Sequence, residues 1–168
     1  MKLSPKVFVN TYLPFAKETE LKTGIDAMFT LAQAALESEW ANKAPRNMFF
    51  GVKATKDTPA DKRQLLTTRE VLSHENGVFP QIISKKKRSD GKWEYKVKDW
   101  FRAYDSPEEC FSDHAEFFFK NKRYAKALEV RHNPYRFAEE IAKAGYATDP
   151  NYATILKNVI RTIERNMP

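Results

Sequence analysis

A single carboxylic acid, Glu37, lies near the end of an otherwise almost wholly apolar segment, Leu31-Ala-Gln-Ala-Ala-Leu-Glu-Ser-Glu-Trp40. Apolar burial disfavours the charged form of a carboxyl group and raises its pKa. An acid that stays protonated near neutral pH can donate a proton to a leaving oxygen. Glycosidic bond cleavage needs such a donor, so a glycosidic bond is the first candidate target. The alternative is a surface acid paired with Lys53 or another base.

Glycosidase chemistry commonly uses a second carboxylate, and Glu70 is the candidate. It ends Thr67-Thr-Arg-Glu70, within a stretch typical of a β-strand. There it is expected to serve as a base or nucleophile, whereas the alternative is a cross-strand salt bridge with a lysine. Glu75 and Asp61 are weaker rivals, because they lie in turn-like or strongly charged segments.

Tyr146 lies in Gly145-Tyr-Ala-Thr-Asp-Pro150, a tight junction between two expected helices. Loops held by rigid flanking elements often line binding sites, and a tyrosine there can hydrogen-bond a sugar. The residues alone favour the simpler interpretation, in which Asp149 caps a helix and the tyrosine packs.

Neither a metal site nor a cofactor is expected. The three histidines, His74, His114 and His132, do not have metal-ligand spacing, and the five glycines form no phosphate-binding loop. The single cysteine, Cys110, excludes an intramolecular disulfide and is expected in a helical core.

Helical patterns occupy both ends of the chain, and period-two patterns occupy the middle. Helices are expected at about 5–22, 26–40, 106–121, 124–130, 134–145 and 150–165, and strands at 64–71, 80–85 and 93–98. Asp90-Gly91 is a hairpin turn signal between the last two strands. We therefore expect a mainly α protein with a small β-lobe, an α+β fold. One domain, 1–168, would combine a helical lobe (about 4–45 and 105–166) with a β-lobe (about 60–104).

The composition indicates a globular protein with an anionic partner. The chain has 168 residues, 42% of them hydrophobic, a net charge of +7 and a pI near 9.4. Such a charge suits nucleic acid, a membrane surface or a bacterial wall. The basic run Lys85-Lys-Lys-Arg88 precedes a hairpin tip, which favours a solvated turn over phosphate binding. No signal-peptide pattern or apolar run of about 20 residues is present, so we expect a soluble chain.

Four stretches together resemble the bacterial glucosaminidases of glycoside hydrolase family seventy-three, which include flagellar rod, autolysin and phage endolysin enzymes. They are Leu31-Ala-Gln-Ala-Ala-Leu-Glu-Ser-Glu-Trp40, Asn47-Met-Phe-Phe-Gly-Val-Lys-Ala54, Trp100-Phe-Arg-Ala-Tyr-Asp-Ser106 and Gly145-Tyr-Ala-Thr-Asp-Pro-Asn-Tyr152. Their order and spacing extend over nearly the whole chain.

The resemblance implies a lysozyme-like fold and cleavage of the β-1,4 bond after N-acetylglucosamine in peptidoglycan. Glu37 falls on the general acid, Glu70 near the glutamate of the β-lobe, and Tyr146 on the tyrosine near the reacting sugar. Further substrate contacts are expected from the matched stretches: Gln33, Trp40, Asn47, Phe49, Phe50, Lys53 and Asp149.

The implied partners are peptidoglycan glycan strands, with anionic wall polymers as a possible addition, and neither nucleic acid nor a membrane span. We expect a monomer that acts on the bacterial wall, outside the cytoplasm, as a phage endolysin or as an excised domain of an exported protein. The alternatives are a muramidase or lytic transglycosylase on the same fold, or a wall-binding module of little activity.

Overall fold

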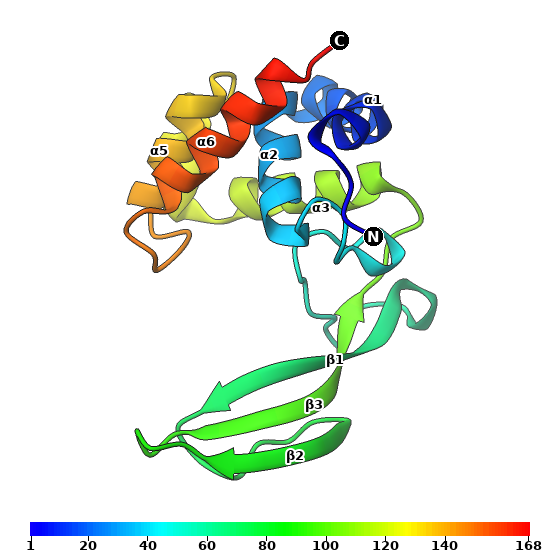
Figure 1. Ribbon diagram of the computed structural model, residues 1–168, viewed down its shortest axis with the longest axis vertical. Helices are drawn as coiled ribbons and strands as arrows, with labels where there is room; N and C mark the ends of the chain where they lie inside the picture. Colours follow the sequence, from blue (N-terminus) through cyan, green and yellow to red (C-terminus); the bar gives the residue numbers. More distant parts are fainter. The chain divides into compact units, whose positions relative to one another are not determined.

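The computed structural model describes residues 1–168, which form two compact units (Figure 1). The helical unit comprises residues 1–50 and 104–168, and the β-unit comprises residues 51–103. The helices are α1 (Pro5–Thr23), α2 (Ala27–Ser38), α3 (Pro107–Lys120), α4 (Ala125–Leu128), α5 (Pro134–Lys143) and α6 (Tyr152–Arg165). The strands are β1 (Arg63–Leu72), β2 (Gln81–Lys87) and β3 (Trp93–Arg102). The expected mainly helical α+β fold is confirmed, and that the two units act as one domain remains a prediction.

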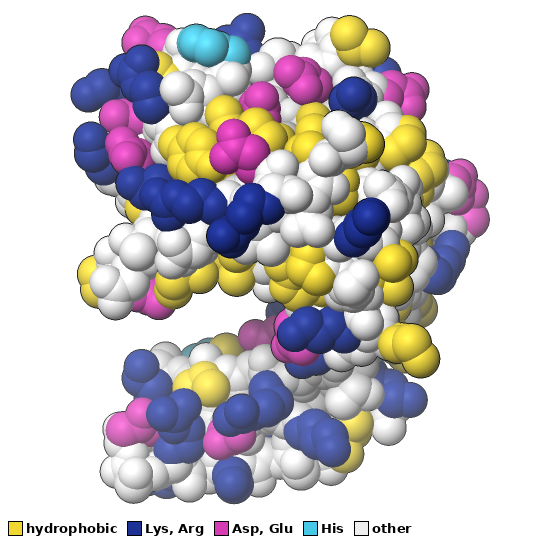
Figure 2. Space-filling view, turned by 45° about the horizontal axis from the view of Figure 1, so that its top comes forward, with side chains coloured by type: hydrophobic (Ala, Val, Ile, Leu, Met, Phe, Trp, Pro, Cys, Tyr) yellow, Lys and Arg dark blue, Asp and Glu magenta, His cyan; other side chains and the backbone are white.

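The β-unit is built on a three-stranded antiparallel sheet with the order β1–β3–β2. The predicted hairpin joins β2 to β3, and Gly91 adopts φ 85° in its turn. Glycine favours this left-handed conformation, which explains the Asp90-Gly91 signal. Figure 2 shows Lys and Arg side chains over the sheet of this unit.

The loop at residues 73–80 is tied to β3 through Tyr95, which is completely buried. The Tyr95 hydroxyl donates to the carbonyl of Glu75 and accepts from the backbone N–H of Gly77 at 3.1 Å. The Phe79 ring lies 5.4 Å from the Tyr95 ring, centroid to centroid. These contacts hold the loop without helix or strand structure of its own.

Local capping signals set the ends of the first two helices. Ser4 Oγ accepts from the N–H of Val7 at the start of α1, and Gly24 ends this helix at φ 76°. Asp26 Oδ1 accepts from the N–H of Met28 at the start of α2. The sequence extended α2 to Trp40, but the helix ends at Ser38 because residues 39–41 all have positive φ.

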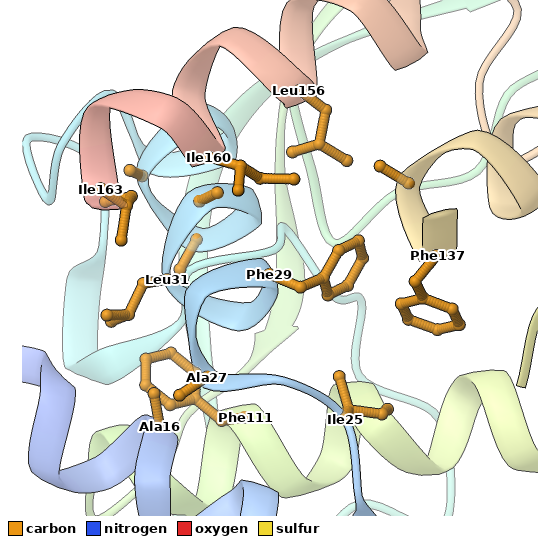
Figure 3. Close-up of a cluster of buried hydrophobic side chains, with 14 of the residues drawn as sticks. Ala16, Ile25, Ala27, Phe29, Leu31, Phe111, Phe137, Leu156, Ile160 and Ile163 are labelled. Carbon is orange, nitrogen blue, oxygen red and sulfur yellow. The ribbon is translucent and has the colours of Figure 1, made fainter. Parts of the chain in front are cut away.

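The core of the helical unit forms around α2, nine of whose twelve residues are buried. Apolar side chains of α6 meet those of α2 in Figure 3, where Ile160 and Ile163 lie on the α6 side and Leu31 on the α2 side. Phe29 also packs against Phe137 of α5, with ring centroids 4.5 Å apart. Because α2 is packed on several sides, its polar side chains have few directions in which they can point.

Two further helix boundaries differ from the sequence prediction. Asp149-Pro150 was expected to start the last helix, but α6 begins at Tyr152. Asp149 Oδ1 instead accepts from the N–H of Asn151 at 2.8 Å, which makes a local turn before the helix. The segment expected as a helix at 124–130 is a 3₁₀ turn at Lys122–Tyr124 followed by the short α4. None of the helices has both the length and the apolar character needed to cross a bilayer.

Candidate active site

Glu37 lies in the last turn of α2, exposed to solvent but flanked by buried residues of the same helix. Its Oε1 accepts a hydrogen bond from the Tyr152 hydroxyl at 3.3 Å. Partial burial raises the pKa of Glu37, and the hydrogen bond from Tyr152 opposes this effect only in part. The helix therefore supplies what a general acid needs, a carboxyl that is accessible yet reluctant to ionise.

Tyr152, the first residue of α6, joins Glu37 to the interior of the helical unit. It is 8% exposed, and its hydroxyl accepts from Gln33 Nε2 at 3.1 Å while it donates to Glu37. Burial raises the pKa of Tyr152 above its ordinary value, so the hydroxyl keeps its proton. Tyr152 thus remains a hydrogen-bond donor throughout the range in which Glu37 titrates.

Gln33 is completely buried one turn before Glu37, and its side chain contacts a histidine. Gln33 Oε1 lies 2.6 Å from His114 Nε2, on α3. The His114 ring stacks on Phe50 at 3.8 Å between centroids and meets Phe118 edge-on at 5.0 Å. Burial lowers the pKa of His114 to about 3, so this imidazole is neutral at ordinary pH.

Tyr146 lies beside this group, with its ring 5.5 Å from that of Tyr152 and stacked on Phe118 at 5.7 Å. Burial raises its pKa, and electrostatic interactions with Tyr152 and Glu37 contribute further. No hydrogen bond within the protein occupies its hydroxyl, which therefore keeps its capacity to donate to a ligand. The structure thus brings Tyr146, Tyr152, Gln33 and Glu37 together on the helical unit.

Glu70 lies on β1 of the β-unit, where it forms an ion pair with Lys53. The Lys53 ammonium also lies 3.2 Å from Asp99 Oδ2, so two carboxylates share one cation. Burial lowers the pKa of Lys53, but hydrogen bonds to Glu70 and Asp99 outweigh this effect and raise it overall. The lysine salt bridge weighed as the alternative for Glu70 is therefore present.

Four further candidates have structural partners. Phe49 was expected to contact substrate, but this is wrong for its ring, which is 2% exposed and packs against Tyr12 and Phe111. Trp40 packs edge-on against Phe8 at 5.4 Å, and Asn47 donates to the carbonyl of Tyr104 at 3.1 Å. Asp149 is exposed and caps the turn described above.

Sequence reasoning gave no role to Tyr152 or His114. Tyr152 ends the Gly-Tyr-Ala-Thr-Asp-Pro-Asn-Tyr stretch that also contains Tyr146. A second tyrosine in the same matched stretch was the signal that could have indicated its role. His114 was considered only as a metal ligand, and a histidine on an apolar helix carries no local sign of its partner. Its contact with Gln33 joins residues 81 positions apart.

Comparison with known proteins identifies the family. The glucosaminidase family model, described as mannosyl-glycoprotein endo-beta-N-acetylglucosaminidase, matches residues 13–165. The peptidoglycan hydrolase FlgJ of Pseudomonas aeruginosa is 32% identical over 98% of this chain and 38% of the relative. A probable N-acetylmuramidase of Lactococcus lactis is 29% identical over 94% of this chain and 33% of the relative. The chain thus spans well under half of either relative's length.

A solved structure agrees with the sequence matches. The glycoside hydrolase domain of Salmonella typhimurium FlgJ superposes with a TM-score of 0.71 at 29% identity, over 97% of this chain and 90% of that domain. Sequence and structure relate the same residues to the same group of enzymes. The chain belongs to the glucosaminidase family of glycoside hydrolases.

Proposed function

We propose that this protein cleaves the β-1,4 bond after N-acetylglucosamine in bacterial peptidoglycan. The observation that carries the proposal is Glu37, an accessible acid with a raised pKa that is hydrogen-bonded to Tyr152. The substrate is inferred from the relatives, several of which are named peptidoglycan hydrolases. The place of action would then be the bacterial wall, outside the cytoplasm, and the protein would work as a monomer.

Glu37 is the proposed general acid. It protonates the glycosidic oxygen as positive charge develops on the sugar ring, and it leaves the step as a carboxylate. Tyr152 then donates to that carboxylate, so the hydrogen bond strengthens as the proton departs. The Tyr146 hydroxyl has no hydrogen-bond partner within the protein, so it can donate a hydrogen bond to the reacting sugar. Gln33 was expected among the substrate contacts, but its side chain is completely buried, so we propose that it supports Tyr152 from the interior instead.

Glu70 is the proposed second carboxylate. Its pairing with Lys53 holds the carboxyl group in place on β1, which suits a base that activates water or a group that stabilises positive charge. In this proposal the main role of Lys53 is to position Glu70 through the ion pair, and contact with the sugar is secondary. The substrate's own N-acetyl group is the other nucleophile available to this chemistry, and it would make Glu70 secondary.

Phe50 and Trp40 remain proposals as sugar contacts, because both rings are only partly buried. Asn47 and Asp149 keep their loops in place through backbone contacts, so we propose that they shape the substrate site indirectly. Anionic wall polymers are a proposed second partner, and no nucleic-acid role is proposed.

The test is digestion of purified peptidoglycan by wild type and Glu37→Gln, followed by reduction and mass spectrometry. We expect reduced N-acetylglucosamine ends from wild type. In Glu37→Gln we expect turnover to fall by several orders of magnitude. Glu39→Gln is the matched control, since Glu39 is exposed two residues away and pairs with Lys43 at 2.9 Å. Full activity in a folded Glu37→Gln protein would contradict the assignment of the acid.

The same experiment tests the second candidate, a muramidase, which the name of the Lactococcus lactis relative favours. Reduced muramic acid ends would keep Glu37 as the acid and move the cut to the other glycosidic bond. A product with an internal anhydro ring would indicate a lytic transglycosylase. Intact peptidoglycan with bound wild-type protein would indicate a wall-binding module instead.

A further inference from the structure

Four side chains form an unbroken series of hydrogen bonds that ends on the proposed acid. His114 Nε2 lies 2.6 Å from Gln33 Oε1, Gln33 Nε2 lies 3.1 Å from the Tyr152 hydroxyl, and that hydroxyl lies 3.3 Å from Glu37 Oε1. The series runs from α3 through α2 and α6 back to α2. It lies wholly within the helical unit.

The orientation of the Gln33 amide sets the direction of the first bond, because its Oε1 faces His114. A neutral imidazole has one N–H and one bare nitrogen, and the neutral form is the one present here. An amide oxygen can only accept, so the nitrogen facing Gln33 Oε1 must carry the ring proton. His114 is therefore the donor in this bond, and its ring is held by stacking on Phe50 at 3.8 Å.

The second bond follows from the first, because the two ends of an amide differ. With its oxygen engaged by His114, Gln33 turns its NH₂ group towards Tyr152 and must donate to it. The Tyr152 oxygen now accepts a hydrogen bond, so its own proton is directed to its remaining partner, Glu37.

We infer that His114 and Gln33 are positioning residues, which orient the Tyr152 hydroxyl so that it donates to Glu37. The inference rests on the proposed role of Glu37 as the acid. Were the Gln33 amide reversed, its oxygen would attract the Tyr152 proton and Glu37 would lose its donor. With its ring proton on Nε2, His114 favours the observed orientation over the reversed one, although it contacts neither Tyr152 nor Glu37.

The consequence lies in how strongly Glu37 holds its proton. A hydrogen bond donated to a carboxylate favours the ionised form, so the series opposes the effect of burial on the Glu37 pKa. Loss of His114 or Gln33 should therefore raise this pKa further. The titratable groups beside Glu37 are Tyr152 and Tyr146, whose pKa values are both raised, so neither ionises in the range where Glu37 titrates.

The direct test is an NMR titration of the Glu37 carboxyl carbon from about pH 3 to about pH 9 in the whole chain. Tyr152→Phe removes the last donor and should raise the Glu37 pKa by about 1 unit. His114→Phe keeps a stacking ring but removes the first donor, and we expect a shift of roughly half a unit in the same direction. Gln33→Met should act like His114→Phe.

Two variants separate positioning from a merely structural role. His114→Gln places an amide nitrogen the same number of bonds from the backbone as the imidazole Nε2, so it should restore much of the wild-type pKa. His132→Phe is the matched control, since His132 is exposed, and it should leave the pKa unchanged. Thermal melts of each variant identify those that fail to fold.

The pH profile of peptidoglycan cleavage gives a second readout. A general acid must be protonated, so the alkaline limb of kcat/KM should move to higher pH in His114→Phe by the same amount as the NMR pKa. Unshifted pKa values in folded His114→Phe and Gln33→Met would overturn the inference. Because the titration needs no activity, a failed glucosaminidase assignment would leave this result readable.

Discussion

The chemistry of Glu37 has a cost for the stability of the fold. Burial raises its pKa, so the ionised form is less stable in the folded chain than in the unfolded chain. A group of this kind favours folding at low pH, and that contribution is lost as the pH rises through the folded pKa. The acid is therefore held in an unfavourable environment that the rest of α2 must support.

Glu37→Gln tests this cost. The amide has nearly the shape of the protonated acid and cannot ionise, so the variant should melt at a higher temperature than wild type at pH 7. The difference should shrink as the pH falls towards the unfolded value of about 4.3, where wild type is protonated too. Thermal melts across this range measure it. Glu39→Gln is the control. A Glu37→Gln variant less stable than wild type at pH 7 would contradict this account.

The sequence predicted Glu37 because the signal is local, a lone acid among small apolar residues of one helix. It did not predict Tyr152, because that hydrogen bond joins residues 115 positions apart. Phe49 failed as a sugar contact for the related reason that an aromatic residue in a loop gives no sign of which packed rings surround it. Residue types indicate chemistry, whereas long-range packing decides which side chains take part.

Among the elements, α3 is fastened to α1 by Glu108, a charged residue that is only 8% exposed. It forms an ion pair with Lys22 and accepts hydrogen bonds from Thr19 at 2.7 Å and from Ser112. Burial alone would raise the Glu108 pKa, but these partners outweigh it and lower the pKa. The sign is opposite to that of Glu37: this acid stabilises the fold above its unfolded pKa, and the effect is lost as the pH falls.

Glu108→Ala should therefore destabilise the protein by about 1–3 kcal/mol at pH 7, since Lys22 and Thr19 lose a buried partner. The loss should diminish below about pH 4 as the wild-type carboxylate is protonated. Chemical denaturation at both pH values measures the difference. Glu116→Ala is the control on the same helix, because Glu116 is exposed and pairs only with Lys120. An equal loss of stability in both variants would show that Glu108 does not link α3 to α1.

Helix starts were predictable where the cap is local, and the segment Ser106-Pro-Glu-Glu109 at the start of α3 shows the limit of that method. Ser106 caps α3 through the N–H of Glu109, at the start of the helix expected from about residue 106. Nothing local distinguished Glu108, whose partners Lys22 and Thr19 lie on α1. Asp149-Pro150 was misplaced because an aspartate that makes a local turn and one that caps a helix have the same sequence signature.

At the scale of the whole molecule, the positive charge is distributed very unevenly. The β-unit has 13 Lys and Arg against 7 Asp and Glu, whereas the helical unit has 16 against 15. Nearly all of the net charge of +7 therefore belongs to residues 51–103. Lys86, Lys87 and Lys92 around the β2–β3 turn are exposed and form no ion pair, so their charge is available to an anionic wall polymer.

Replacing Lys86, Lys87 and Lys92 together by Gln should weaken binding to isolated cell walls severalfold at low ionic strength. The control replaces Lys6, Lys17 and Lys126, three exposed lysines of the helical unit, with the same change in net charge. Because the Debye length falls from about 30 Å at 0.01 M to about 3 Å at 1 M salt, the two triple variants should converge on wild type as salt rises. Sedimentation of protein with walls measures both effects. Equal weakening in the two variants would mean that total charge governs attachment, and salt-independent binding would mean that charge does not.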